Sequence, residues 1–174
     1  PSRTSAFTAM TAIRHAGGFV SFDPNIREDL WQDEHLLRLC LRQALQLADV
    51  VKLSEEEWRL INGKTQNDRD ICALAKEYEI AMLLVTKGAE GVVVCYRGQI
   101  HHFAGMSVNC VDSTGAGDAF VAGLLTGLSS TGLSTDEREM RRIIDLAQRC
   151  GALAVTAKGA MTALPCRQEL EGEK

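Results

Sequence analysis

The spacing of apolar residues alternates along the chain between the period of a helix and that of a buried strand. Apolar positions three and four residues apart predict amphipathic helices over residues 5–15, 33–47 and 67–77, and another that a capping box at 134–137 opens. Nearly continuous apolar runs predict strands at 19–22, 49–53, 81–85 and 92–95, with 99–103 completing a hairpin or meander. This alternation predicts an α/β fold in which a sheet lies between layers of helices.

The stretch 111–120, which reads VDSTGAGDAF, joins a tight loop to a long apolar run. Residues 119–128 are apolar nearly all the way round, which predicts a helix buried on both sides. At the start of such a helix, free backbone N–H groups and the positive end of the helix dipole together bind an anion. The N–H groups expected to converge there belong to Gly115, Ala116, Gly117 and Asp118.

Asp118 places a negative charge beside this expected anion site. A carboxylate there suits a general base that takes the proton from a hydroxyl attacking a phosphoryl group. The alternative is structural, because an aspartate in the first helical turn also stabilises the helix through its dipole. The spacing does not match the G-x-x-x-x-G-K-[ST] phosphate loop, and Phe120 stands where a dinucleotide fingerprint has its third glycine.

Composition narrows the classes of partner. With 19 Lys and Arg against 23 Asp and Glu, the net charge of −4 offers no general attraction to nucleic acid or to an anionic membrane. The six cysteines are scattered without a C-x-x-C pair, which predicts small core residues in a reducing cytosol. Without a membrane-spanning apolar run or a signal-peptide pattern, we expect one cytoplasmic domain.

The segment DSTGAGDAF resembles the D-T-x-G-A-G-D signature of the ribokinase-like carbohydrate kinases, also called the PfkB family. Within that family, residues 23–31 and 157–165 are most similar to bacterial fructokinases and aminoimidazole riboside kinases. The resemblance covers nearly all 174 residues but only the C-terminal, nucleotide-binding portion of such an enzyme. It implies a three-layer α/β/α ribokinase-like fold over residues 1–174, without the N-terminal part and β-lid. The start at Pro1, with no methionine, likewise suggests a piece of a longer protein.

The resemblance implies that Asp118 is the catalytic base and that the amides of Gly115, Ala116 and Gly117 hold the charge on the phosphoryl group. It implies a nucleotide-binding role for the loop after the third strand, in residues Thr86, Lys87, Gly88, Ala89, Glu90 and Gly91, and for Gln148 near the adenine. From the residues alone, 86–91 read as an ordinary connection to the next strand.

Two further motifs have both a structural and a functional interpretation. Asn25 and Arg27 follow a strand in a D-P-N-x-R segment that lies near the active cleft in fructokinases, although a plain Asx turn explains the same residues. Ser54 and Glu57 form a capping-box pattern. Relatives carry N-x-x-E here, so the resemblance implies that Ser54 contacts phosphate, despite being shorter than asparagine, and that Glu57 organises Mg²⁺ through water.

The resemblance also implies a candidate K⁺ site beside the anion hole, formed by Asp112, Thr114 and the carbonyls of Ala154, Ala157 and Gly159. The expected reaction is the transfer of the γ-phosphoryl group of ATP to D-fructose, which gives fructose 6-phosphate and ADP. A kinase for aminoimidazole riboside or a related substrate, and a noncatalytic nucleotide-binding or structural module, remain alternatives. We expect a sugar substrate, no nucleic-acid or membrane partner, and a homodimer in the complete protein.

Overall fold

The computed structural model describes residues 2–63, 67–133 and 136–171. The chain forms two compact units. The first comprises Pro1–Lys87 and Val92–His102, and the second comprises Gly88–Gly91 and Phe103–Lys174. Residues 88–91 belong to the second unit although they lie between two segments of the first, so neither unit is continuous along the chain.

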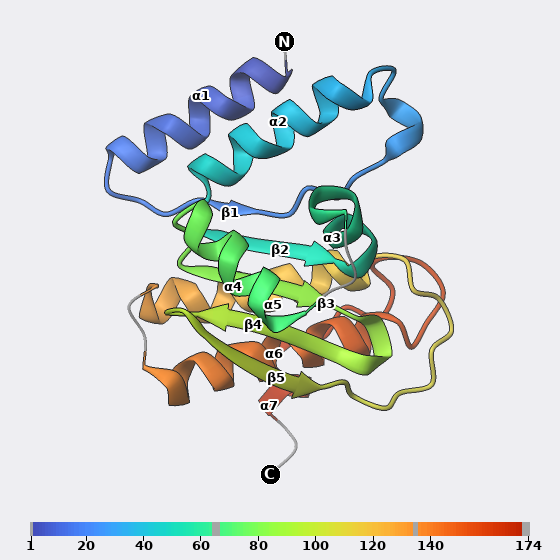
Figure 1. Cartoon of the computed structure of the whole chain (residues 1–174). Helices are drawn as coiled ribbons and strands as arrows, with labels where there is room; N and C mark the ends of the chain where they lie inside the picture. The colour runs from blue at the N-terminus through green and yellow to red at the C-terminus, as the bar shows by residue number, and fades with distance from the viewer. Residues whose placement is uncertain (1, 64–66, 134–135, 172–174) are drawn as a thin grey trace. The chain divides into compact units, whose positions relative to one another are not determined.

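A five-stranded sheet in the order β1-β2-β3-β4-β5 organises the first unit (Figure 1). The strands are β1 (Ser21–Phe22), β2 (Val50–Ser54), β3 (Met82–Thr86), β4 (Gly91–Tyr96) and β5 (Gln99–Ala104). The first three strands are parallel, and β4 runs antiparallel to β3. The residues of β2, β3 and β4 are almost all buried, as their continuous apolar runs predict. The expected α/β class is confirmed, with a mixed sheet.

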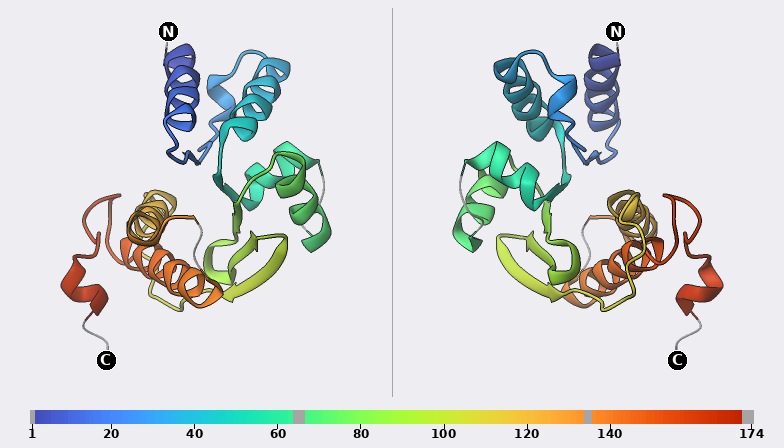
Figure 2. Two further views of the ribbon diagram at one scale, coloured as in Figure 1. Left: turned by 90° about the vertical axis from the view of Figure 1, so that its left-hand side faces the viewer. Right: turned by 90° about the vertical axis from the view of Figure 1, so that its right-hand side faces the viewer.

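One described α-helix precedes β1, and three more with the short 3₁₀ helix η1 (Glu28–Leu30) connect the first three strands. They are α1 (Ser2–His15), α2 (Glu34–Leu47), α3 (Glu55–Asn62) and α4 (Asp68–Glu77). Helices α1 and α2 lie side by side (Figures 1 and 2). Asp33 caps α2 and Asn67 caps α4, each accepting a bond from the third helical N–H, as their side-chain chemistry favours. Trp58, Ile71 and Leu83 are fully buried in the core that these elements share.

The second unit contains η2 (Gly88–Glu90), α5 (Ala116–Thr131), α6 (Glu137–Ala154) and α7 (Arg167–Glu171). Helices α5 and α6 pack closely because small residues line the contact. A Cβ on Gly123 would lie 2.9 Å from the Cα of Ala147. Within the described structure, Ala122 and Thr126 on the opposite side of α5 are exposed. The expectation that α5 is buried all round was therefore wrong, because the apolar run includes small residues that do not form a second buried face.

Two predicted boundaries also need correction. The strand expected at 19–22 is reduced to Ser21–Phe22, because the Val20 amide donates to the side chain of Asp49 at 2.8 Å instead of to a neighbouring strand. The N-cap of α6 is Asp136, whose carboxylate accepts from Glu139 N, so the capping box predicted at 134–137 is not the one that starts the helix. Residues 134 and 135 lie outside the described residues. None of the described helices is long and apolar enough to cross a membrane.

The cysteines are less uniformly buried than predicted. Cys95 and Cys150 are buried, Cys40 and Cys72 are partly exposed, and Cys110 and Cys166 are exposed, all as free thiols. Burial raises the pKa of Cys95 to about 12, and the adjacent Cys72 thiol, with sulfur atoms 3.4 Å apart, adds to this shift. Burial also raises the pKa of Cys150. Apolar neighbours in sequence did not distinguish a loop cysteine such as Cys110 from a core one.

We expect iodoacetamide at pH 7.5 to alkylate Cys110 and Cys166 first and Cys95 last, because the thiolate is the reacting form and the loop thiols are exposed whereas Cys95 is buried. Peptide mapping by mass spectrometry over a time course of the folded protein measures this order. The same labelling in denaturant is the control, where the order should disappear. Equal rates for Cys95 and Cys110 in the folded protein would contradict the buried position of Cys95.

Candidate active site

The carboxylate of Asp112 organises the loop that precedes α5. One oxygen, Oδ1, accepts hydrogen bonds from Thr114 N at 3.0 Å and from Thr114 Oγ1 at 2.7 Å. The other oxygen accepts from the backbone N–H of Gly159 at 2.9 Å. These bonds hold the pKa of Asp112 below its usual value, with the Thr114 hydroxyl as the main cause. Asp112 therefore fastens the loop to the segment after α6 while keeping its charge.

The first turn of α5 has no side-chain cap among the described residues. Its N-cap residue is Gly115, which lies in the left-handed region with φ 84°, and no side chain in the described ranges accepts a bond from this end of the helix. In the described part of the chain, the N–H groups of Gly115, Gly117 and Asp118 have no hydrogen-bond acceptor. Asp118 is exposed. The turn can therefore present N–H groups and a carboxylate to a ligand.

One of the four amides expected to be free is occupied. The N–H of Ala116 donates to the carbonyl of Ser113 at 3.2 Å, which closes a tight turn just before the helix. The prediction of four free amides was wrong at this position, because the sharp turn that the glycines permit consumes one N–H group itself. The candidate anion-binding donors in this structure are thus the amides of Gly115, Gly117 and Asp118.

Close approach of the chain explains the glycine at position 115. A Cβ built there would lie 2.8 Å from the carbonyl oxygen of Ala160 and 3.0 Å from its Cα. The positive φ alone disfavours other residues. Ala160 follows Gly159, the residue that Asp112 fastens, so the two segments meet at both positions.

The residues of the candidate K⁺ site are brought together only in part. Asp112, Thr114 and Gly159 form one hydrogen-bonded group, as described above. Ala154 is the buried last residue of α6, and Ala157 is partly exposed in the turn that follows. The carbonyl of Val155, between them, already accepts from the N–H groups of Val111 at 2.8 Å and Asp112 at 3.2 Å. No group of three or more metal-binding acidic, histidine or cysteine side chains occurs among the described residues.

In the first unit, the predicted cleft residues Asn25 and Arg27 contact each other at the end of β1. The guanidinium of Arg27 donates to the Asn25 side-chain oxygen at 2.7 Å and to two backbone carbonyls. Asn25 has φ 43°, and its N–H donates to Asp23 Oδ1 at 3.2 Å in an Asx turn. Both residues are exposed. The Asx turn is thus observed, and a role for its exposed side chains in substrate binding stays a prediction.

Glu57 is buried and both of its carboxylate oxygens accept backbone hydrogen bonds. Oε2 accepts from Ser54 N at 2.7 Å, while Ser54 Oγ accepts from Glu57 N at 3.2 Å. This confirms the predicted capping box at the start of α3. Oε1 accepts from Ile26 N at 2.9 Å, which connects α3 to the turn that carries Asn25. No local pattern in the sequence signals this second bond.

We expect Glu57→Gln to lower the free energy of unfolding by about 1.5–3 kcal/mol, because an amide nitrogen cannot accept one of the two charge-assisted bonds. Urea denaturation measures the change. Glu55→Gln is the control: its partly exposed ion pair with Arg59 at 3.2 Å should contribute below about 1 kcal/mol. A stability unchanged by Glu57→Gln would contradict the structural contribution of these two bonds.

The predicted nucleotide loop divides between the two units. Thr86, at the end of β3, donates its hydroxyl to Leu53 O at 3.3 Å, and Lys87 is partly exposed. Gly88, Ala89 and Glu90 form the exposed helix η2. Gly91 has φ 107°, and a Cβ there would collide with the carbonyl oxygen of Phe103, so this position requires glycine. Close packing of the backbone at Gly91 against Phe103 shapes this loop. The loop joins β3 to β4, so the structure also fits the alternative prediction of an ordinary connection between strands.

Gln148 is partly exposed on α6, one turn before Gly151. A Cβ at Gly151 would lie 3.2 Å from Ala116 O, so the first turn of α5 packs closely against α6 at this point. The nucleotide-binding role of Gln148 stays a prediction.

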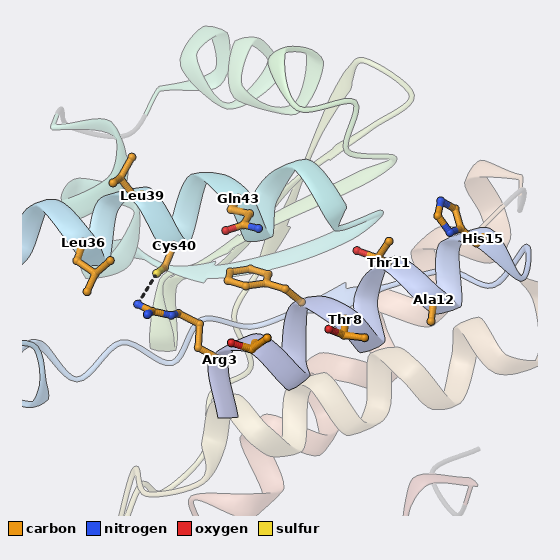
Figure 3. A pocket seen from close by; sticks show the side chains of 11 residues that line it. Arg3, Thr8, Thr11, Ala12, His15, Leu36, Leu39, Cys40 and Gln43 are labelled. Carbon is orange, nitrogen blue, oxygen red and sulfur yellow. Dashed lines mark hydrogen bonds between the residues drawn. The ribbon is translucent and has the colours of Figure 1, made fainter. Parts of the chain in front are cut away.

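The open loops described above are not part of the cavity that lies between α1 and α2 (Figure 3). This cavity of about 770 Å³ is lined by residues including Phe7, His15 and Leu39, and none of the predicted site residues lines it. The candidate site is therefore identified from its backbone amides and its carboxylate, and not from this cavity.

Reasoning from sequence missed two contributors to these loops. Lys52 forms a buried ion pair with Asp23, and the backbone of Ala160 contacts Gly115. A lysine inside the apolar run VVKL was a usable signal for the first, since an unpaired charge is rarely buried. The second depends on a contact between distant segments and had no local signal.

In this α/β protein, a helix start without a side-chain cap, amides without an acceptor among the described residues and a neighbouring carboxylate form a candidate anion-binding site. The profile described as "pfkB family carbohydrate kinase" matches residues 1–167, and the chain belongs to this family. Family membership accounts for the order of the motifs along the chain.

Individual relatives agree with this assignment. The chain is 98% identical over 174 residues to a fructokinase from Escherichia coli and 53% identical over 171 residues to one from Klebsiella pneumoniae. It spans 57% and 56% of the lengths of these proteins, while 100% and 98% of the chain is covered. The chain is thus similar to a little over half of each curated relative.

Solved structures show the same fold. A fructokinase double mutant from Vibrio cholerae, in a form with fructose, ADP and potassium ion bound, aligns with a TM-score of 0.91 and 41% identity over 99% of this chain and 55% of that one. The aminoimidazole riboside kinase of Salmonella enterica, complexed with aminoimidazole riboside and an ATP analog, aligns with a TM-score of 0.89 and 34% identity over 99% of this chain and 57% of that one. The ribokinase-like fold expected from the sequence is confirmed for a partial chain.

Proposed function

We propose that the complete protein containing this chain transfers the γ-phosphoryl group of ATP to D-fructose, giving fructose 6-phosphate and ADP. The observation that carries the proposal is the first turn of α5, where amides without an acceptor among the described residues stand beside the exposed carboxylate of Asp118. The 98% identity to the E. coli fructokinase supports the same substrate. The similar V. cholerae fructokinase, which binds fructose and ADP in its crystal structure, supports it independently.

In the proposed mechanism, Asp118 accepts the proton of the attacking sugar hydroxyl. A bond forms between that oxygen and the γ-phosphorus while the bond from the γ-phosphorus to the bridging oxygen of ADP breaks. The amides of Gly115 and Gly117 donate to the phosphoryl oxygens, whose negative charge the dipole of α5 also stabilises. Because these donors are fixed by the turn, they need little reorganisation during transfer. Residues 86–91 and Gln148 bind the nucleotide, with Ser54 donating its hydroxyl toward a phosphate.

The proposal includes two metal ions, Mg²⁺ near Glu57 and K⁺ near Asp112. Glu57 holds two backbone N–H groups, yet each oxygen has a further lone pair that can accept a bond from a water on Mg²⁺, an ion that binds mainly through phosphates and water. Mg²⁺ bound to ATP supplies positive charge at the phosphates. For K⁺, Asp112 supplies a carboxylate that stays ionised, with Thr114 and the carbonyls of Ala154, Ala157 and Gly159 as candidate neighbours.

The proposal also covers the location, the partners and the oligomeric state of the protein. A cytoplasmic location fits the six free cysteines. The net charge of −4 argues against nucleic-acid and anionic-membrane partners. A homodimer of the complete protein is part of the same proposal, and gel filtration with light scattering tests it.

A substrate panel tests the proposed activity. The complete protein is incubated with ATP and Mg²⁺ and with fructose, ribose, glucose or aminoimidazole riboside, and ADP release is measured by a coupled assay. The proposal predicts the highest kcat/KM with fructose. Tight ATP binding without turnover of any sugar would contradict it and favour a noncatalytic nucleotide-binding module.

The second candidate is a kinase for aminoimidazole riboside. Its support is the alignment with the S. enterica enzyme, whose TM-score of 0.89 is close to the 0.91 of the fructokinase. The identity of 34% against 41% favours fructose. A higher kcat/KM with aminoimidazole riboside in the same panel would reverse this order.

A further inference from the structure

A turn of unusual backbone conformation follows β1, and several contacts hold it. Asn25 adopts φ 43°, which non-glycine residues rarely do, although asparagine tolerates it best. The N–H of Ile26 is bound to Glu57, and the N–H of Asn25 is bound to Asp23. These two hydrogen bonds stabilise the turn in this conformation.

The partner of Asp23 lies on the neighbouring strand. Parallel pairing of β1 and β2 matches Phe22 with Val51, and the residues that follow this pair are Asp23 and Lys52. Lys52 Nζ lies 3.2 Å from Asp23 Oδ2, and the two side chains are only 10% and 16% exposed. The other oxygen of Asp23 accepts the Asn25 N–H. One carboxylate thus joins a buried cation to the turn.

We propose that Lys52 is a positioning residue, which keeps the carboxylate of Asp23 oriented so that the turn presents Asn25 and Arg27 to the sugar. The inference rests on the proposed function, which places these two side chains in the substrate cleft. Removal of Lys52 leaves a largely buried carboxylate without its counter-charge. The carboxylate of Asp23 then turns toward water, and its bond to the Asn25 N–H weakens.

The physical argument favours positioning over simple stability. A buried ion pair is often no more stabilising than two apolar side chains of similar size, since desolvation offsets the attraction. Val50, two residues before Lys52 and therefore on the same face of β2, is fully buried, which shows that this face accommodates an apolar residue. A lysine at this position therefore contributes orientation of Asp23, which an apolar residue cannot supply.

The test uses Lys52→Met in the complete protein, since methionine retains much of the aliphatic stem. We expect KM for fructose to rise about tenfold or more, while KM for ATP changes little, as a small displacement of substrate-positioning groups requires. Hydrogen exchange measured by mass spectrometry should show faster exchange at residues 23–27 and unchanged protection of β2 and β3. Lys76→Met, an exposed lysine of α4, is the matched control and should change neither readout.

A second variant separates positioning from folding. Asp23→Asn combined with Lys52→Met removes the unpaired charge while the amide oxygen still accepts the Asn25 N–H, so the double variant should recover most of the loss in KM and protection. Recovery is expected even where Lys52→Met alone folds poorly. A KM for fructose within twofold of the wild type in Lys52→Met, or a double variant no better than the single one, would overturn the proposal. A wild-type protein that phosphorylates no sugar would instead overturn the proposed function, and the positioning role with it.

Discussion

Replacing Asp118 with asparagine is expected to lower kcat of the complete kinase by about 10²–10⁴-fold, the contribution typical of a positioned general base. Asparagine has nearly the same shape but cannot take the proton of the attacking hydroxyl. Because Asp118 is exposed at the first turn of α5 and caps nothing, its loss should leave the helix in place. Steady-state assays with fructose and ATP measure kcat, and calorimetric titration measures the Kd of ATP, which should change little.

Asp145→Asn is the matched control, because Asp145 is also an exposed aspartate on a helix of the second unit. It should retain full activity. If Asp118 serves only the helix dipole, Asp118→Asn would cost about 0.3–1 kcal/mol of stability and leave kcat intact. That pattern would remove the base from the proposed mechanism.

The second large effect is expected for Gly115→Ala. The added Cβ would lie 2.8 Å from Ala160 O, at a residue whose φ of 84° is already unfavourable for alanine. Either the turn, which carries the candidate phosphate site, or the segment of Ala160, which is bound to the same loop through Asp112 and Gly159, must move. We expect kcat/KM to fall about 100-fold or more, because displacements near 1 Å have effects of this size.

Gly98→Ala separates the two causes of this loss. Gly98 has a similar φ of 75°, but a Cβ there would meet nothing within 4 Å, so only the conformational strain is introduced. The control should therefore lose stability without losing activity, as thermal unfolding and the same kinetic assay can show. Equal losses of activity in the two variants would mean that the contact with Ala160 has no part in the site.

Local chemistry explains which features the sequence could predict. The capping box of Ser54 and Glu57, the cap at Asp33 and the buried strands depend on residues close together in the chain, so their patterns carry the information. The motif around Asp118 likewise predicted a tight turn that opens a helix, which the structure contains.

Features that depend on distant segments were missed or mistaken. The neighbour of Gly151 is the backbone of Ala116, and no pattern near residue 151 indicates this. The Ile26 amide reaches Glu57 across 31 positions, and Lys52 reaches Asp23 across 29. The Ala116 amide was mistaken for a local reason, since it donates to Ser113 O within the turn itself. The motif indicated that a turn exists without showing which N–H groups it leaves free.

The most direct test of the central claim is a single-turnover measurement of phosphoryl transfer in the Asp118→Asn variant of the complete protein. Excess enzyme is mixed rapidly with ³²P-labelled ATP and saturating fructose, and labelled sugar phosphate is followed in quenched samples. This isolates the chemical step from substrate binding and product release. The account predicts a transfer rate constant at least about 100-fold below that of the wild type. A rate constant within a few-fold of the wild type would contradict it.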